Sequence, residues 1–233
     1  MKVAIIPARS GSKRIKNKNI REFCGYPMIG RAILNAKKSG LFDRIIISTA
    51  SIKIKAVAHS FGGEVPFLRP KNLADDFTST ISVVRHGIQW FLEQGVKLSA
   101  VCCIYPATPF LKPEDLNLGL KHLKEKGVDF TYAITSFPHP IQRAMEMDED
   151  GRLTMNDPNM SNIRSQDLVE TYHDAGQFYW ANFQTWLEKK TILDCQNAGV
   201  ILPKFRAIDI DTLDDWVLAE RIFQASSANG WTN

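Results

Sequence analysis

Residues 2–20 read KVAIIPARSGSKRIKNKNI, an apolar β-branched run that stops at Pro7 and leads directly into a loop of small and basic residues. The run over 3–6 has the composition of a buried central strand. In open α/β sheets, ligands bind at the carboxyl ends of the strands. The stretch therefore predicts an α/β fold with a ligand site immediately after the first strand.

The loop that follows Pro7, residues 8–19, is called the basic loop here. Ser10, Gly11 and Ser12 allow the backbone to come close to a ligand and offer N–H and hydroxyl donors. Positive charge comes from Arg9, Lys13, Arg14, Lys16 and Lys18. This combination suits a polyphosphate, although a solvated basic loop gives the same pattern. The loop matches neither the Walker A motif nor the dinucleotide fingerprint.

Length and charge narrow the class of protein. A chain of 233 residues fits one α/β domain with an embellishment, so we treat 1–233 as a single domain. The 29 Lys and Arg residues exceed the 25 Asp and Glu residues by four, and seven of the bases lie in the first 21 positions. Such local basicity favours a discrete anionic ligand over nucleic acid.

The cysteine pattern and the hydropathy predict a cytoplasmic protein without a membrane partner. The four cysteines show no C-x-x-C spacing; they are Cys24, Cys102, Cys103 and Cys195. Reduced thiols are expected. We find no signal-peptide pattern and no apolar run near the roughly 20 residues of a membrane span.

Strand and helix patterns alternate along most of the chain. Strands are expected at 3–6, 44–50, 64–68, 99–105, 130–136, 177–182 and 205–211. Helices are expected at 27–39, 52–61, 78–93, 113–126 and 212–224. The alternation predicts a mostly parallel sheet with helices on both faces. Residues 225–233 are expected to fray.

The alternation is interrupted at 138–172. Segments 144–147 and 152–155 flank Asp148-Glu149-Asp150-Gly151, which has the turn chemistry of a hairpin. We interpret 138–172 as an excursion from the sheet that serves the active site, a contact between subunits, or both.

Two aspartates near the C-terminus form the sharpest chemical pattern, in Ile208-Asp209-Ile210-Asp211-Thr212. On a strand, alternate side chains share a face, so both carboxylates would project together. Paired carboxylates beside substrate phosphates suit Mg²⁺. The alternative is an exposed pair beside a helix start, since Thr212 and Asp215 have the spacing of a capping box.

The segment before the helix expected at 78–93 contains Asp76 and Thr78, which we interpret as N-terminal caps. Arg69 follows an expected strand. It either faces the ligand or has a structural role.

Two further segments offer groups for a sugar or a base. The loop 105–110 is stiffened by Pro106 and Pro109, and it is either a ligand wall or a simple turn. The segment 172–182 is rich in aromatic and hydrogen-bonding groups, and His173 in it is either structural or a ligand contact. No Ser-His-Asp or Cys-His spacing stands out, which favours metal-assisted transfer over covalent catalysis.

Several of these motifs together resemble one family. The run Ile6-Pro7-Ala8-Arg9-Ser10-Gly11-Ser12-Lys13-Arg14 with Lys18-Asn19-Ile20 resembles the signature loop of the nonulosonic (sialic-type) acid cytidylyltransferases. Later blocks resemble that family in the same order: Leu68-Arg69-Pro70, Pro106-x-x-Pro109 and Ile208-Asp209-Ile210-Asp211-Thr212. The segment 172–180 looks most like the pseudaminic acid branch.

The resemblance implies a Rossmann-like nucleotide-diphospho-sugar transferase fold and a homodimer, with the excursion serving dimerisation and sugar binding. It implies CTP, a nonulosonic acid and Mg²⁺ as partners, and CMP-sugar for cell-surface glycan synthesis plus pyrophosphate as products. Catalytic roles would fall to Arg9, Lys18, Asp209 and Asp211, the last two holding the metal. Nucleotide contacts would come from Ala8, Arg9, Ser10, Gly11, Ser12, Asn19, Arg69 and Thr108. Sugar contacts would come from Tyr105, Gln142, Arg143, Tyr172, His173, Gln177 and Tyr179.

Two departures from the sialic acid enzymes bear on the substrate. Those enzymes usually carry Gln where this chain has Tyr105, and an Arg-Pro-Asn-Gly-like run at 173–176. Both departures argue against ordinary sialic acid. Pseudaminic acid is the favoured substrate, with legionaminic, sialic and 3-deoxy-octulosonic acids as alternatives. Other classes left open are a metal-dependent glycosyltransferase and a nucleotide-binding module without catalysis.

Overall fold

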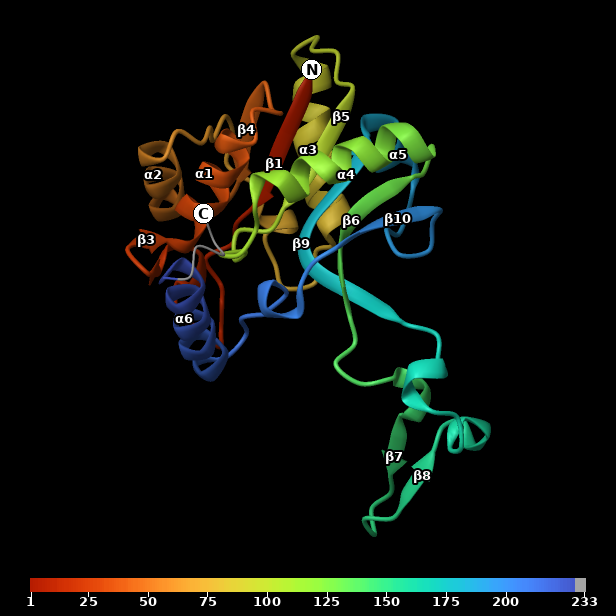
Figure 1. The fold of residues 1–233 in the computed structure, drawn as a ribbon. Coiled ribbons are helices and arrows are strands. Elements are labelled where there is room, and N and C mark those ends of the chain that lie inside the picture. The colour runs from red at the N-terminus through yellow and green to blue at the C-terminus, as the bar shows by residue number, and fades with distance from the viewer. Residues whose placement is uncertain (229–233) are drawn as a thin grey trace.

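The computed structural model describes residues 1–228, and a central sheet of six strands organises them (Figure 1). The strand order is β10-β6-β9-β5-β1-β4. Strand β9 runs antiparallel to both of its neighbours, and every other pair in this sheet is parallel. The bounds are β1 Lys2–Pro7, β4 Arg44–Ser48, β5 Ala100–Ile104, β6 Phe130–Ser136, β9 Tyr172–Asn182 and β10 Asn197–Ile201. The prediction of a mostly parallel sheet is confirmed.

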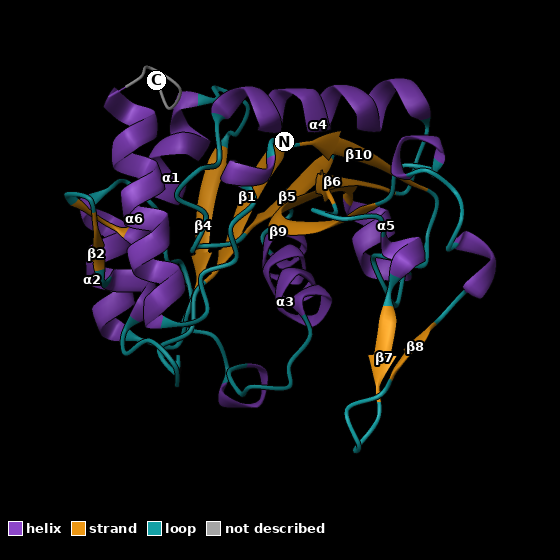
Figure 2. Ribbon diagram, turned by 60° about the horizontal axis from the view of Figure 1, so that its bottom comes forward, coloured by secondary structure: helices purple, strands orange, loops and turns teal. Residues whose placement is uncertain are grey.

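Helices cover both faces of the sheet, as Figure 2 shows for α4 above it and α3 below it. The first face carries α1 (Met28–Lys38), α2 (Ile52–Ser60) and α4 (Pro113–Lys126). The second carries α3 (Thr80–Glu93) and α5 (Phe183–Glu188). Strand β1 shows why both faces of the sheet need a helical cover. Ala4 and Ile6 enter the first apolar cluster, and Val3 and Ile5 enter the second, because successive side chains alternate between faces.

A third apolar cluster joins the two ends of the described chain. Trp216 of α6 (Leu213–Ala228) packs with Ile15 of the basic loop and with Ile210. Phe23, in the small hairpin of β2 (Glu22–Phe23) and β3 (Tyr26–Pro27), meets the Trp216 ring edge-on at 5.5 Å. This packing places residues 209–211 beside the basic loop.

The excursion after β6 extends away from the rest of the protein in both ribbon views (Figures 1 and 2). It contains the antiparallel pair β7 (Met145–Met147) and β8 (Leu153–Met155). Asp148 N donates to the carbonyl of Arg152 at 3.0 Å, and Gly151 has φ +80°, a conformation that glycine adopts readily. The predicted hairpin is confirmed.

The strand expected at 64–68 is wrong. Glu64 forms a single bridge with Ile46, with hydrogen bonds of 2.7 Å and 2.8 Å to the neighbouring positions of β4. Pro66 has no N–H to continue the ladder, so pairing stops there.

The strand expected at 205–211 is also wrong, because the last strand of the described chain is β10. Gly199 in β10 weakens the sequence signal for a strand. Its packing requires glycine, since a Cβ there would lie 2.2 Å from Cδ1 of Ile134. Residues 207–211 form an irregular segment after a short 3₁₀ turn at Lys204–Arg206.

Several boundaries also differ from expectation, most by one or two residues. Strand β9 begins at Tyr172 rather than at 177. Helix α3 begins at Thr80, since Ser79 is its N-cap and accepts a hydrogen bond from Ser82 N at 3.2 Å. Asp76 and Thr78 are therefore not its caps. Residues 225–228 are helical rather than frayed, and the rest of the expected frayed end, 229–233, lies outside the described residues.

Candidate active site

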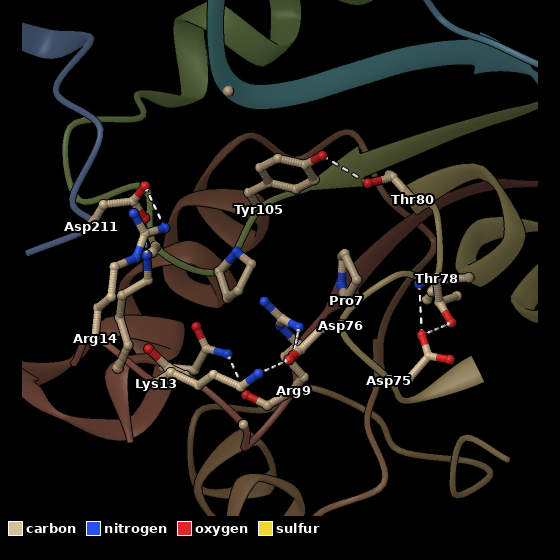
Figure 3. A pocket seen from close by; sticks show the side chains of 18 of the residues that line it. Pro7, Arg9, Lys13, Arg14, Asp75, Asp76, Thr78, Thr80, Tyr105 and Asp211 are labelled. Atoms are coloured by element: carbon tan, nitrogen blue, oxygen red, sulfur yellow. Dashed lines mark hydrogen bonds and ion pairs between the residues drawn. The ribbon is translucent and has the colours of Figure 1, made fainter. Parts of the chain in front are cut away.

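One cavity of about 700 Å³ opens where β1 and β5 end, as the strand-end rule predicts (Figure 3). The basic loop lines one side of it, and the loop after β5 lines another. Nine of the predicted site residues line this cavity: Arg9, Gly11, Ser12, Lys18, Asn19, Arg69, Tyr105, Asp209 and Asp211. The fold thus gathers most of the predicted nucleotide and metal residues in one place.

The cations of the basic loop lie against carboxylates across the cavity. Lys18 Nζ lies 3.3 Å from Oδ1 of Asp211, 193 positions away, and donates to the carbonyl of Ile210 at 2.5 Å. The Arg14 guanidinium lies 2.7 Å from Oδ2 of Asp211. Clustered cations facing solvent in a cavity attract anions, so this side suits phosphate groups.

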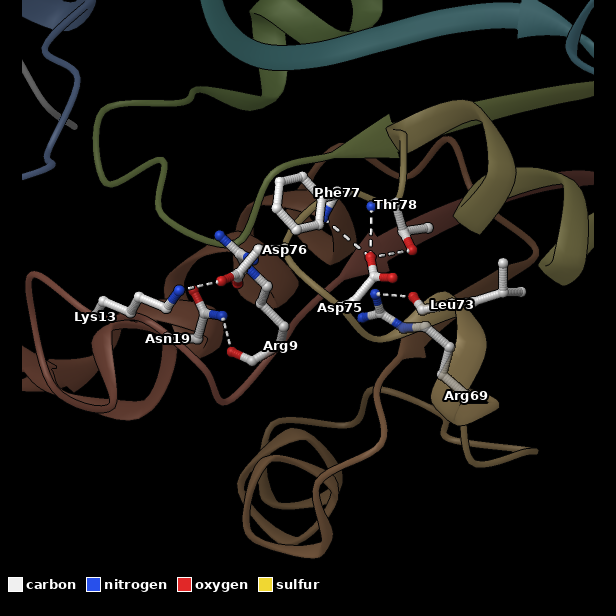
Figure 4. Close-up of polar contacts among 9 residues, drawn as sticks. All are labelled: Arg9, Lys13, Asn19, Arg69, Leu73, Asp75, Asp76, Phe77 and Thr78. Atoms are coloured by element: carbon white, nitrogen blue, oxygen red, sulfur yellow. Dashed lines mark hydrogen bonds and ion pairs between the residues drawn. The ribbon is translucent and has the colours of Figure 1, made fainter.

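Asp76 pairs with two more cations of the basic loop, as Figures 3 and 4 show. It pairs with Arg9, and its Oδ2 lies 2.6 Å from Nζ of Lys13. Hydrogen bonding and the charge of Lys13, followed by the charge of Arg9, lower the pKa of Asp76. Neighbouring Asp75 closes its own turn by accepting from the N–H and the hydroxyl of Thr78, both at 2.7 Å.

Asn19 fixes the shape of the basic loop from within. Its Nδ2 donates to the carbonyl of Arg9 at 2.9 Å (Figure 4). Asn17 adopts a left-handed conformation with φ 57°, which asparagine tolerates better than most residues. These features hold the Arg9 backbone while its side chain faces the cavity.

Arg69 reaches the cavity from a buried position. Its guanidinium donates to the carbonyls of Ser48 at 2.5 Å and Leu73 at 3.3 Å, while its Nε has no partner among the described residues. Burial, and secondarily the charge of Arg9, lower its pKa to about 10. Because Arg69 lines the cavity, its positive charge favours an anionic ligand there.

The two aspartates fit a divalent cation. The capping box starts α6 as predicted: Asp215 Oδ2 accepts from Thr212 N at 2.7 Å, and Asp215 N donates to Thr212 Oγ1 at 3.2 Å. Asp209 makes no hydrogen bond or ion pair with any other residue in 1–228. Burial, then the charge of Asp211, raise the pKa of Asp209. An oxygen-binding cation would relieve this like-charge pair.

These two carboxylates are too few for a metal site made by protein alone. Within the described chain, no group of three or more His, Cys, Asp or Glu side chains is arranged to hold a metal ion. Substrate phosphates and water commonly complete the shell of Mg²⁺. The arrangement therefore suits a metal that arrives with a nucleotide.

Across the cavity from Arg9 and Lys13 lie Tyr105 and Thr80 (Figure 3). The Tyr105 hydroxyl and Thr80 Oγ1 are 2.7 Å apart. Gly176 of β9 lines the cavity as well. Burial raises the pKa of Tyr105 above its usual value, so it is a neutral hydrogen-bonding group at neutral pH.

A protein-family model described as Cytidylyltransferase matches residues 3–194. The chain belongs to this family. A pseudaminic acid cytidylyltransferase of Campylobacter jejuni is 38% identical over 96% of this chain and 97% of the relative. A CMP-N,N'-diacetyllegionaminic acid synthase of Legionella pneumophila is 30% identical over 95% of this chain and 96% of the relative.

A solved structure has the same fold as this cytidylyltransferase. It is a CMP:2-keto-3-deoxy-manno-octonic acid synthetase complexed with CTP, which aligns with a TM-score of 0.68 over 97% of this chain and 99% of that chain. The sequence identity is 14%, so the likeness concerns the fold alone. The predicted Rossmann-like nucleotidyltransferase fold is confirmed.

Three predicted nucleotide residues of the cytidylyltransferase lie outside the cavity lining. Ala8 is fully buried, and its N–H donates to the carbonyl of Ser48 at 2.9 Å. Ser10 lines a smaller neighbouring hollow. Thr108 is buried, and its hydroxyl donates to the carbonyl of Tyr105 at 2.8 Å, so it shapes the loop after β5.

Two predicted sugar residues are buried behind the cavity wall. Gln177 donates to the carbonyl of Arg206 at 2.5 Å, and Tyr179 donates to Asp174 at 2.6 Å. His173 faces Phe137, with ring centroids 4.9 Å apart. None of these side chains lines the cavity.

The three remaining sugar candidates lie on or next to the excursion. Gln142 donates to the carbonyl of Val169 at 2.8 Å, Arg143 to that of Ile163, and Tyr172 to the carboxylate of Glu170 at 2.8 Å. All are outside the cavity of their own chain. Their role in sugar binding stays a prediction.

Sequence reasoning missed Asp75, Asp76, Thr78 and Thr80 as cavity residues. A signal was present for Asp76, because Ser79 lies three positions before Ser82 and serves as the helix cap, which leaves Asp76 available. For Thr80 no local signal exists. Its contact with Tyr105 joins positions 25 apart that only the fold brings together.

Across residues 1–228, no helix has both the length and the apolar character needed to cross a membrane.

Proposed function

We propose that this cytidylyltransferase activates a nine-carbon nonulosonic acid, with pseudaminic acid favoured, by transferring CMP from CTP and releasing pyrophosphate. One observation carries the proposal: the basic loop and the Asp209/Asp211 pair line the same cavity, although they come from opposite ends of the chain. Cations for a triphosphate and carboxylates for its metal are the two requirements of nucleotidyl transfer.

The preference for pseudaminic acid rests on two points. The relative named for that activity aligns over nearly the whole length of both chains. Tyr105, which replaces the Gln usual in sialic acid enzymes, lines the cavity opposite the cations. Legionaminic, sialic and 3-deoxy-octulosonic acids are the alternatives.

The cations bind and orient the triphosphate in this proposal. Arg9, Lys13, Arg14 and Lys18 contact phosphate oxygens, and Arg69 contacts the nucleotide from the cavity wall. The C2 hydroxyl oxygen of the sugar attacks the α-phosphorus in line. The new O–P bond forms as the bond to the β-phosphate breaks, and pyrophosphate leaves with the cations stabilising its charge. The hydroxyl proton passes to solvent.

Asp209 and Asp211 would hold Mg²⁺ together with phosphate oxygens. The bound ion supplies charge neutralisation at the reacting phosphates. In the ligand-free protein Asp211 pairs with Arg14 and Lys18, so we propose that these cations move to the triphosphate when the metal binds.

A homodimer and a cytoplasmic location complete the proposal. The excursion exposes apolar side chains, among them Met147 and Leu153, which suits burial against a second copy. Its polar residues Gln142 and Arg143 would then lie near the partner's sugar. All four cysteines are free thiols, as expected in a reducing compartment.

Pyrophosphate release tests the function directly. The enzyme is incubated with CTP and Mg²⁺ in four parallel reactions. Each reaction contains one acid: pseudaminic, legionaminic, sialic or 3-deoxy-octulosonic acid. We expect release to be fastest with pseudaminic acid and absent without a sugar. If the protein binds CTP but releases pyrophosphate with none of the four acids, the protein would be a nucleotide-binding module without catalysis. Loss of more than a hundredfold in turnover is expected for Asp211→Ala, and unchanged turnover would refute the metal site.

A further inference from the structure

Strand β9 carries a bulge where it passes the cavity. Tyr132 of β6 pairs with Tyr179, but Ile134 pairs with Asp174, so residues 175–178 of β9 lie opposite position 133 alone. Gly176 lies within this bulge with φ +60° and lines the cavity. Bulges recur beside active sites because they redirect a strand and its side chains.

One carboxylate closes the bulge. Asp174 Oδ1 accepts from the N–H of Gly176 at 2.8 Å, and Oδ2 accepts from the hydroxyl of Tyr179 at 2.6 Å. Asp174 itself does not line the cavity. Its carboxylate is linked to the cavity wall directly through Gly176 and indirectly through Tyr179.

Tyr179 links Asp174 to a residue that lines the cavity, Tyr105. Tyr179 is 4% exposed, and its ring packs on Tyr105 with centroids 5.4 Å apart. Burial, followed by the charges of Tyr105 and Asp174, raises the pKa of Tyr179, so its hydroxyl stays protonated and donates. Tyr105 then meets the cavity with its hydroxyl fixed on Thr80.

Tyr105 lies on the side of the cavity opposite Arg9 and Lys13 (Figure 3). If the cations take the triphosphate, the wall of Tyr105 and Gly176 is left for the second substrate. We propose that Asp174 is a positioning residue that fixes Tyr105 and Gly176 against the acid sugar. This inference rests on the proposed function, and it assigns the predicted sugar role of Tyr179 to an indirect effect through Tyr105.

The carboxylate is suited to this task because it only accepts hydrogen bonds. In Asp174→Asn, the side-chain oxygen can still accept from the N–H of Gly176. The side-chain NH₂ replaces the other oxygen, so it would donate to the Tyr179 hydroxyl, whereas the carboxylate accepts from it. Asp174→Asn should therefore preserve more of the wall than Asp174→Ala. Tyr179→Phe removes the Tyr179 hydroxyl and with it the bond to Asp174, and it leaves the bond between Asp174 and Gly176 in place.

The test compares KM values for the two substrates. We expect Asp174→Ala to raise the sugar KM on the order of tenfold, as loss of bonds to a charged group predicts, with the CTP KM within about twofold of wild type. Tyr179→Phe should shift the sugar KM in the same direction by less. Asp174→Asn should lie between Asp174→Ala and wild type.

Asp129→Ala is the matched control. Asp129 pairs with Lys189 at 3.0 Å and accepts from Gln196 N at 3.2 Å, next to the start of β6 and away from the cavity. Its loss should lower thermal stability without separating the two KM values. If Asp174→Ala does not fold, Tyr179→Phe and Asp174→Asn carry the test alone.

The outcomes separate this inference from the proposed function. A wild-type enzyme without pyrophosphate release for any acid refutes the function. An active wild type whose Asp174 and Tyr179 variants keep the sugar KM refutes the positioning role. A parallel rise in both KM values refutes it as well, because a positioning role in the sugar wall predicts a rise in the sugar KM alone.

Discussion

Asp76 Oδ2 lies 2.6 Å from Nζ of Lys13, and the same carboxylate pairs with Arg9, so one acidic side chain occupies two cations of the basic loop (Figure 4). Both cations face the cavity. A triphosphate bound there must compete with Asp76 for them.

Asp76→Asn should therefore strengthen CTP binding. Exposed ion pairs are weak, so the Kd should be lower by a factor of roughly 1.5 to 5. Isothermal titration in Mg²⁺-free buffer measures this, and the gain should shrink at high salt. Glu125→Gln on the exposed side of α4 removes the same charge far from the cavity and should leave Kd unchanged. Weaker binding by Asp76→Asn would show that Asp76 orients the cations instead.

The parts of the site that sequence could predict depend on local pattern and on one rule of topology. The β-branched run before Pro7 predicts β1, and parallel strands end at one edge of a sheet, which places the basic loop beside Tyr105. Asp209 and Asp211 were predicted to face one way on a strand. They line the cavity together, but from an irregular segment anchored by Ile210 in the α6 cluster.

The parts that sequence could not predict are contacts between distant segments. Asp76 meets Arg9 across 67 positions, and no local pattern predicts that partner. The bulge that joins Asp174 to Tyr179 depends on the register between β6 and β9, which the fold sets. Strand β10 was not predicted because Gly199 weakens the strand pattern. The need for glycine comes from a contact with another strand, since Gly199 makes room for Ile134.

Asp209→Asn should stabilise the ligand-free protein while it inactivates the enzyme. The folded-state pKa of Asp209 is raised, so this group favours folding below its unfolded-state pKa, and that contribution is lost as pH rises through the folded-state value. At neutral pH its charge opposes folding. The variant should have a higher Tm than wild type at pH 7 in the absence of Mg²⁺ and CTP.

Two comparisons make this prediction specific. The Tm difference should vanish at a pH below about 4, where the unfolded carboxyl is also protonated. Asp194→Asn, an exposed aspartate outside the cavity, should change Tm at neither pH. Turnover of Asp209→Asn with CTP and Mg²⁺ should fall on the order of 10²-fold, because a metal ligand is lost. A lower Tm at pH 7 would contradict the raised pKa.

Arg206→Met should destabilise the fold strongly. The Arg206 guanidinium lies 2.6 Å and 3.0 Å from the two carboxylate oxygens of Asp115, and both side chains are nearly buried. Removing one partner leaves a buried charge unpaired, which costs about 3–5 kcal/mol. Urea unfolding followed by circular dichroism measures the loss, and Arg152→Met at an exposed pair should cost less than about 1 kcal/mol.

A second substitution separates the charge effect from packing. Asp115→Leu in the Arg206→Met background removes the stranded carboxylate, so part of the stability should return. Asp115 also accepts from Lys112 N at 2.9 Å at the start of α4, which limits the recovery. A double variant no more stable than Arg206→Met would show that the loss of the Asp115 cap on α4 outweighs the removal of the unpaired carboxylate.

The excursion should carry the contact between two copies of the chain. Met147 and Leu153 are paired across β7 and β8 and are 71% and 63% exposed, so lysine at both positions would place charge in a buried interface. Light scattering after size exclusion should give twice the 26.3 kDa chain mass for wild type and one chain mass for the double variant. Leu218→Lys, at a 52% exposed leucine of α6, should remain dimeric. A dimeric double variant would mean that another surface joins the subunits, and a monomeric variant with an unchanged sugar KM would mean that Gln142 and Arg143 do not serve the partner's site.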